Sequence, residues 1–257
     1  MKKLNFIIKC GLALLLLSFY SCESWLNVTP SDRLSEEMLF NDREGFVKAL
    51  NGVYIELNTN ELYGRNLTAG ALDVMGQYYS VASSSHAFYN YGGLVYTGND
   101  EKALFDNMWQ KCYAVIACCN TIIEKCDENK AGLSPVWKGA IKGEALALRA
   151  MLHFDMLRLF GPLTSELDKE SIPYQTNSDQ TVTPLLSGSE VVGLILDDLK
   201  NAVGLLKDTD PYFVEEEFSD TDLNYRRFRM NYFAAKGLMA RVQLWGGDKE
   251  KAAATAK

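Results

Sequence analysis

Histidines and paired carboxylates are the side chains of this sequence that could carry acid–base chemistry, but their spacing does not favour it. His86 falls in a predicted loop and His153 in a predicted helix, and neither stands in a recognisable Ser-His-Asp, Cys-His or HExxH motif. Asp197 and Asp198 are adjacent on a predicted helix, so their side chains point about 100° apart and do not face each other across a cleft, as a glycosidase requires. We expect both, and the glutamates of 215–217, to be solvated surface charges. We therefore predict no catalytic residue, no metal site and no cofactor.

Other polar candidates on predicted helices fit structural roles better. We expect His153 to be a satisfied core histidine beside an i, i+3 ion pair of Asp155 and Arg158. Four cysteines occur in one predicted helix, where positions seven residues apart are separated by about 10 Å, whereas a disulfide needs Cα atoms within about 7 Å. They have no neighbouring histidine and no CxxC spacing, which argues against zinc. The four expected packing residues are Cys112, Cys118, Cys119 and Cys126.

One stretch has the composition of a ligand-contacting loop. From Val74 to Asn99 there is no charged residue, although 23% of the sequence is charged. Aromatic rings beside neutral hydrogen-bonding groups suit a sugar, which has C–H faces to stack and hydroxyls to bond. The predicted contacts are Tyr78, Tyr79, His86, Tyr89, Asn90, Tyr91, Tyr96 and Asn99, with Tyr89 and Tyr91 as the main stacking platforms. A loop packed on the core, or a protein-contact surface, where tyrosine is also enriched, are the alternatives.

The elements that must position this loop are amphipathic helices. The first is capped by Asp42 and has apolar residues from Phe46 to Leu57 at helical spacing, and the second runs from about Glu101 to Cys126. The inward positions of the second are Phe105, Trp109, Cys112, Ile116 and Ile123.

Later helices carry clear start and stop signals. A third is predicted to start at the cap Ser134, with Pro135 in its first position, and to end at a left-handed Gly161. A fourth starts with the capping box of Ser187 and Glu190. A fifth covers 230–245 and a sixth follows Asp248. The small side of the fifth, which would allow close helix packing, consists of Ala234, Ala235, Gly237 and Ala240. No strand-like alternation of useful length appears, so the predicted fold class is all-α. The small helix face resembles those of tetratricopeptide-type helix pairs, although the sequence shows no repeat period.

The N-terminus has the form of an export signal. Three lysines are followed by the apolar run Gly11–Leu17, small Ser21 and then Cys22. We predict a lipoprotein signal peptide over 1–21 with lipidation of Cys22, and an ordinary secretory signal with an incidental cysteine as the alternative. Because the signal contains three lysines and no acid, its removal takes the formal charge from −7 to −10, which argues against nucleic acid or anionic lipid as partner.

Five segments in order resemble the SusD/RagB family of outer-membrane lipoproteins. The opening "CESWLNVTPSDRLSEEMLFNDREGFVKALNGVYIEL" is similar to the family's lipid cysteine, nearby proline and first helix. "MWQKCYAVIACCNTIIEKCD" resembles its second long helix. "GEALALRAMLHFDMLRLFGPL" is similar to its most recognisable segment, with His153 at the family's tyrosine position and one residue fewer before the proline. "SEVVGLILDDLKNAVGLL" and "AAKGLMARVQLWGGDKEKAAATA" resemble the next two elements.

The resemblance implies an all-α fold of tetratricopeptide-like helical pairs with long irregular loops. It implies a cell-surface, lipid-anchored outer-membrane protein that binds glycans or oligosaccharides for uptake through a TonB-dependent SusC-like transporter and does not cleave them. Family members run to roughly twice this length, with part of the ligand site and partner contact in their second half. We thus expect 22–257 to be the N-terminal helical region, with the C-terminal half absent and the stability correspondingly lower. A lipid-anchored helical-repeat scaffold without a glycan site, and a lipid-anchored glycosidase, are the competing functions.

Overall fold

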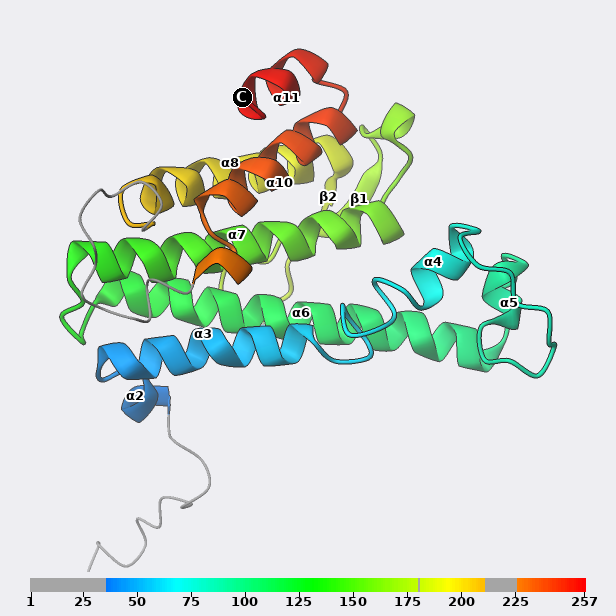
Figure 1. Cartoon of the computed structure of the whole chain (residues 1–257), viewed down its shortest axis with the longest axis horizontal. Coiled ribbons are helices and arrows are strands. Elements are labelled where there is room, and N and C mark those ends of the chain that lie inside the picture. Colours follow the sequence, from blue (N-terminus) through cyan, green and yellow to red (C-terminus); the bar gives the residue numbers. More distant parts are fainter. Residues whose placement is uncertain (1–35, 180, 211–225) are drawn as a thin grey trace, which may run out of the picture. The chain divides into compact units, whose positions relative to one another are not determined.

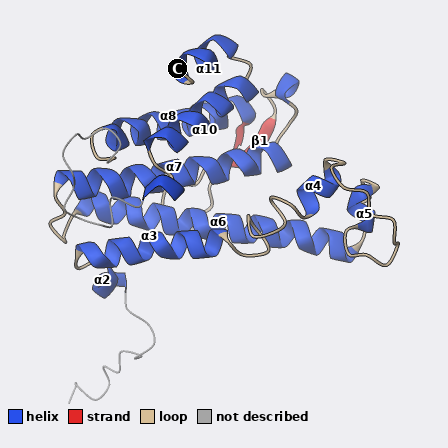
Figure 2. Cartoon of the chain, viewed as in Figure 1, coloured by secondary structure: helices blue, strands red, loops and turns tan. Residues whose placement is uncertain are grey.

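The computed structural model describes residues 36–179, 181–210 and 226–257. Within these ranges helices dominate and the two strands are short (Figure 2). The chain forms two units. The first runs to Leu39 and contains the four-residue helix α2 (Glu36–Leu39), and the second, Phe40–Lys257, contains the main hydrophobic core. The predicted all-α fold class is confirmed.

Helix α7 (Pro135–Phe160) lies at the centre of the second unit. It forms an antiparallel hairpin with α6 (Asn99–Glu128), packs against α8 (Gly188–Lys207) on another side, and also contacts α3 (Arg43–Leu57) (Figure 1). Most α7 side chains from Gly139 to Leu157 are buried, and they occur all round the helix. A helix that is apolar all round is stable only in the interior, which explains why the other long helices surround this one.

Two glycines let α8 approach α7 closely. A Cβ atom on Gly139 would lie 2.7 Å from Cγ2 of Thr209, and one on Gly143 would lie 2.8 Å from Cγ of Leu206. Both distances are shorter than van der Waals contact, so a larger residue would force the helices apart. The α7–α8 interface therefore depends on backbone positions without a side chain.

Helices α10 (Tyr232–Trp245) and α11 (Lys249–Thr255) complete the second unit, with α10 on α8 and α11 on α10. The predicted small face of α10 packs only in part. Ala235 is fully buried, but Ala234 and Gly237 are exposed, and nothing lies within 4 Å of a Cβ placed on Gly237. The close helix approach expected there occurs between α7 and α8 instead.

The predicted helix starts are confirmed by their hydrogen bonds. Asp42 accepts from the amide of Gly45 at 2.8 Å, and Ser134 caps α7 with Pro135 in its first turn. Ser187 and Glu190 form the complete capping box of α8, and Asp248 caps α11. The predicted left-handed Gly161 is wrong, because its backbone is extended, with φ −85° and ψ 179°.

A small antiparallel sheet was not predicted. Strands β1 (Glu170–Pro173) and β2 (Leu185–Ser187) pair irregularly between α7 and α8, after the short 3-10 helix η2 (Thr164–Glu166). Strands of three and four residues are too short to show an alternating pattern that could be distinguished from loop.

A buried ion pair joins α7 to α8, and it corrects one prediction. The guanidinium of Arg149 donates two hydrogen bonds of 2.7 Å to the carboxylate of Asp198, which also accepts one from the Tyr174 hydroxyl at 2.6 Å. Asp197 is exposed as predicted, but Asp198 is buried. The prediction failed because the interhelical partner, 49 positions away, is invisible in local spacing.

Candidate functional site

The uncharged stretch 74–99 forms an irregular excursion between the short helix α4 (Ala71–Met75) and the start of α6, with the single turn α5 (Tyr89–Gly92) inside it (Figure 1). Tyr91 anchors α5 to the core. Its ring is 2% exposed and meets those of Phe88, at 5.8 Å between centroids, and Phe105 of α6, at 5.9 Å. Burial raises the pKa of the Tyr91 hydroxyl to about 12, helped by the nearby carboxylates of Glu101 and Asp100. The loop therefore rests on α6 through a packed aromatic cluster.

Two side-chain hydrogen bonds hold the same turn. The amide nitrogen of Asn90 donates to Oε1 of Glu101 at 2.8 Å, and Glu101, in the first turn of α6, is only 5% exposed. A carboxylate there faces the positive end of the helix dipole, which stabilises its charge. The amide nitrogen of Gln77 donates to the carbonyl of Gly92 at 2.9 Å. The two bonds fix both sides of α5.

The loop encloses two adjacent hollows. The first, which we call the Phe88 hollow, has a volume of about 530 Å³, within the roughly 300–1,000 Å³ of small-ligand pockets. The second, the Tyr89 hollow, measures 420 Å³. Tyr79, Ser80 and Val81 line both, so this segment is the wall that the hollows share.

The structure brings half of the predicted contact residues to these hollows. Tyr79 lines both, His86 lines the Phe88 hollow, and Tyr89 and Asn90 line the Tyr89 hollow. The exposed residues Tyr78, Tyr96 and Asn99 line neither.

The prediction of Tyr91 as a stacking platform is corrected by its burial, since a ring that is covered by Phe88 and Phe105 offers no free face. Tyr89 and Tyr91 are two positions apart, and only contact with α6 decides which of them is buried. Ligand contact by the other predicted residues stays a prediction.

Sequence reasoning missed several lining residues. Ser80, Val81, Ala82 and Val95 line one or both hollows but carry no individual signal. Their membership of an uncharged run next to Tyr79 is the one indication the sequence offers.

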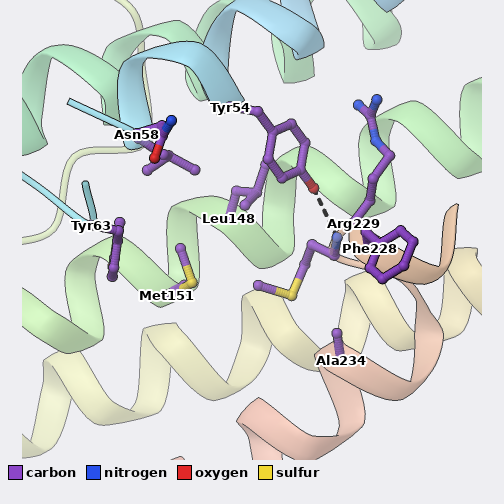
Figure 3. A pocket seen from close by; sticks show the side chains of 10 residues that line it. Tyr54, Asn58, Tyr63, Leu148, Met151, Phe228, Arg229 and Ala234 are labelled. Carbon is purple, nitrogen blue, oxygen red and sulfur yellow. Dashed lines mark hydrogen bonds between the residues drawn. The ribbon is translucent and has the colours of Figure 1, made fainter. Parts of the chain in front are cut away.

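A third pocket, of 390 Å³, lies between α3, α7 and the segment that contains the 3-10 helix η3 (Arg226–Phe228) and the start of α10 (Figure 3). The polar side chains of Tyr54, Tyr63 and Arg229, which line it, bond to other groups of the protein. The Tyr54 hydroxyl donates to Glu144 and accepts from the amide of Met230 at 2.8 Å, the dashed line in Figure 3. Arg229 donates to Glu144 at 2.8 Å, and its guanidinium lies 4.6 Å from the centre of the Tyr54 ring. Burial and the Glu144 charge raise the pKa of the Tyr54 hydroxyl. These bonds connect α3, α7 and the segment before α10, so the bonded groups are not free to bind a polar ligand.

The remaining predicted chemistry is structural. His153 accepts from the amide of Gln175 at 3.0 Å through Nε2, and its Nδ1 lies 3.0 Å from the carbonyl of Arg149, so the predicted satisfied core histidine is confirmed. Burial lowers its pKa to about 3. The predicted pair of Asp155 and Arg158 is present at 3.6 Å.

Neither described histidine belongs to a catalytic arrangement. His86 Nδ1 accepts from the amide of Phe88 at 3.1 Å, which is a local turn contact. Among the described residues, no group of three or more histidine, cysteine, aspartate or glutamate side chains could hold a metal ion. The run 215–217 lies outside the described residues.

Three of the four helical cysteines pack as predicted. Cys112, Cys119 and Cys126 are buried and unpaired, seven residues apart on α6. Cys118 is also unpaired but exposed, which corrects its predicted role, because adjacent helix positions point about 100° apart and Cys119 takes the buried one.

The predicted signal peptide 1–21 and the lipidation site Cys22 lie outside the described residues. In the described ranges, none of the helices is both long enough and apolar enough to cross a bilayer.

Comparison with known proteins gives consistent matches. A family model described as "Starch-binding associating with outer membrane" (SusD-like) matches residues 24–244. A SusD-like protein of Formosa agariphila is 25% identical over 99% of this chain and 45% of its own length. The chain thus spans less than half the length of this curated relative.

Solved structures show the same fold. A SusD-like carbohydrate-binding protein from Bacteroides vulgatus aligns with a TM-score of 0.65 at 23% identity, over 84% of this chain and 44% of that protein. A laminarin-binding SusD-like protein aligns with a TM-score of 0.60 at 17% identity, over 84% of this chain and 42% of that one.

Proposed function

The chain belongs to the SusD-like family of starch-binding proteins that associate with the outer membrane, and from this premise we propose that its aromatic loop binds neutral glycans. The hollows on either side of Tyr79 are the observation that carries the proposal. Tyr79 and Tyr89 keep about half of their surface exposed and offer flat faces beside the polar groups of Ser80 and Asn90. Rigid, amphipathic tyrosine rings lose little conformational entropy on contact, which favours them in binding sites.

Charge supports a neutral ligand. No aspartate, glutamate, lysine or arginine occurs between Val74 and Asn99, and Glu101, just after this stretch, is buried and bonded to Asn90. An anionic glycan would need a lysine or arginine within the loop to compensate its desolvated charge.

The cellular setting is part of the same proposal. We infer that Cys22 carries lipid, that the protein is anchored to the outer membrane at the cell surface, and that a TonB-dependent SusC-like transporter receives the glycan, without cleavage by this chain. The family assignment and the export-type N-terminus support this. Because the chain covers less than half of the relative reported above, glycan binding by these 257 residues alone is part of the proposal.

Calorimetry with malto- and laminari-oligosaccharides tests glycan binding. Tyr79→Ala and Tyr89→Ala should each weaken binding by about 5- to 150-fold. This range assumes that a sugar stacked on a tyrosine contributes as much as a base stacked on an aromatic ring, ~1–3 kcal/mol. Tyr78→Ala is the matched control, since this tyrosine is 80% exposed and lines neither hollow. Affinity should hardly change between low and high salt, because no ion pair is formed. Binding that survives both substitutions would instead assign the loop to packing or to protein contact.

Three further measurements test the setting. Cys22→Ser should move the protein from the membrane to the soluble fraction, and protease added to intact cells should remove the wild-type protein. Chromatography of the glycans after incubation should show no change in chain length. Membrane retention of the serine variant, or shortened glycans, would contradict the lipid anchor or the binding role, respectively.

A further inference from the structure

We propose that a small buried cavity beside Arg226 is a binding site for one ordered water molecule, which bonds the Arg226 guanidinium and the Glu144 carboxylate. The cavity is separate from the two hollows of the aromatic loop. The inference therefore goes beyond glycan binding and does not depend on it.

The size of the cavity is the first support. It has a volume of 30 Å³. One water molecule needs roughly 10–15 Å³, whereas pockets for small organic ligands begin near about 300 Å³. Its lining includes Leu50 of α3, Ala140 and Glu144 of α7, and Arg226 of η3, and all four residues are buried. The cavity thus has room for water and not for a sugar unit.

Unpaired polar atoms on a buried charge are the second support. The Arg226 side chain is only 4% exposed, and its Nη1 donates to Oε2 of Glu144. Among the residues that the structure describes, however, its Nε and Nη2 have no hydrogen-bond partner. Asp210 does not provide one, because its Oδ2 lies 3.7 Å from Nε, which is too long for a hydrogen bond. Buried polar groups in proteins are nearly always bonded to protein or to ordered water, so we expect water at these nitrogens.

Charge balance favours a neutral occupant. The guanidinium groups of Arg226 and Arg229 face the carboxylates of Glu144 and Asp210, so the formal charges of this cluster cancel. A halide ion of similar size would add an uncompensated negative charge to the interior, which is unfavourable. Water adds no charge, and it can accept from Arg226 while it donates to Glu144, which lines the same cavity. Two such bonds are enough for a buried water.

The water would complete the hydrogen bonding where three parts of the fold meet. Glu144 of α7 accepts from the Tyr54 hydroxyl of α3, and from Arg226 and Arg229 in the segment before α10. Arg229, labelled in Figure 3, lines this cavity as well as the third pocket. The site therefore belongs to the junction that holds these elements together.

Crystal structures of the purified protein, grown with chloride and with bromide, test the site directly. We expect a peak in the cavity about 2.7–3.2 Å from Nε or Nη2 of Arg226, without anomalous signal in the bromide crystals. An anomalous bromide peak would assign the cavity to a halide ion and overturn the water site. An empty cavity, with Arg226 bonded directly to Asp210, would also overturn it.

Oxygen-17 relaxation dispersion of the solvent, which counts long-lived internal waters, tests the site in solution. Ala140→Val places two more methyl groups at the cavity, so this variant should have one long-lived water fewer than the wild type. Ala147→Val is the matched control, because it makes the same change at a buried position of α7 that does not line the cavity. Circular dichroism checks that both variants are folded.

The water counts decide between the outcomes. A lower count for Ala140→Val alone would support the site, whereas equal counts for the wild type and Ala140→Val would contradict it. A count that falls equally in both variants would also contradict it, because the loss would then not come from this cavity. If Ala140→Val does not fold, the wild-type crystal structures decide by themselves.

Discussion

Replacing Asp198 by asparagine tests whether the buried ion pair between α7 and α8 holds the fold together. The Arg149 guanidinium donates two 2.7 Å hydrogen bonds to this carboxylate, and the side chains are 7% and 10% exposed. Burial alone would lower the pKa of Arg149, but the hydrogen bonds and charge of Asp198 raise it, so the arginine stays charged. Asparagine would leave that charge buried without compensation.

The expected loss is large. Removing one partner of a buried ion pair costs about 3–5 kcal/mol, whereas a surface substitution usually changes stability by less than ~0.5 kcal/mol. The adjacent, exposed Asp197 provides the matched control, since Asp197→Asn makes the same chemical change on the same helix. The folding equilibrium should fall at least about 100-fold for Asp198→Asn, and less than about 3-fold for Asp197→Asn, at ~1.4 kcal/mol per factor of ten.

Urea unfolding followed by circular dichroism measures both. If Asp198→Asn fails to fold, the double variant Arg149→Met, Asp198→Leu provides the second test, because replacing both charges by apolar groups avoids the uncompensated ion. This double variant should fold and be more stable than the single one. A loss below about 1 kcal/mol for Asp198→Asn, or similar losses for the two asparagine variants, would refute the assignment of a buried, stabilising pair.

Four other substitutions or treatments give distinct outcomes. Tyr91→Ala should cost about 3–5 kcal/mol of stability in urea unfolding because it empties a packed site, while Tyr91→Phe, which loses one long 3.5 Å contact, should cost little. Glu101→Ala removes a hydrogen bond worth about 1.5–3 kcal/mol, so amides of the α5 turn should exchange hydrogen faster than in the wild type. Burial lowers the pKa of His153 to about 3, so the unfolded chain binds a proton below pH 6.5 that the folded protein does not bind. The free energy of unfolding should therefore be independent of this group above pH 6.5 and should fall by about 1.4 kcal/mol per pH unit between pH 6.5 and 3. His153→Gln should remove this slope. Iodoacetamide should label Cys118 in the native protein, and Cys119 only after unfolding, as read by peptide mass spectrometry.

Short-range signals explain what was predictable in the fold. Helix starts at Asp42, Ser134, Ser187 and Asp248 were correctly placed, because a cap depends on residues within one turn of each other. Four buried residues of α8, Ile195, Leu199, Ala202 and Leu206, likewise follow the helical apolar spacing that is visible in the sequence. The left-handed conformation predicted for Gly161 at the end of α7 was wrong, since glycine can adopt either an extended or a left-handed conformation.

The candidate site was predictable as a region rather than as a set of residues. Absence of charge and abundance of tyrosine marked 74–99, and both hollows lie there. Their division by the Tyr79–Val81 wall depends on how the loop turns back on itself, and the bonds of Gln77 to Gly92 and of Asn90 to Glu101 determine that path.

The sequence by itself determined the helical class, the helix starts and the uncharged loop, because each follows from neighbouring residues. Tertiary structure decided which of two similar residues is buried: Asp198 and not Asp197, Tyr91 and not Tyr89. Burial of a side chain depends on the element that packs against it. Asp198 meets an arginine 49 positions away, and Tyr91 meets the rings of α6, so that identical residue types one or two positions apart acquire opposite roles.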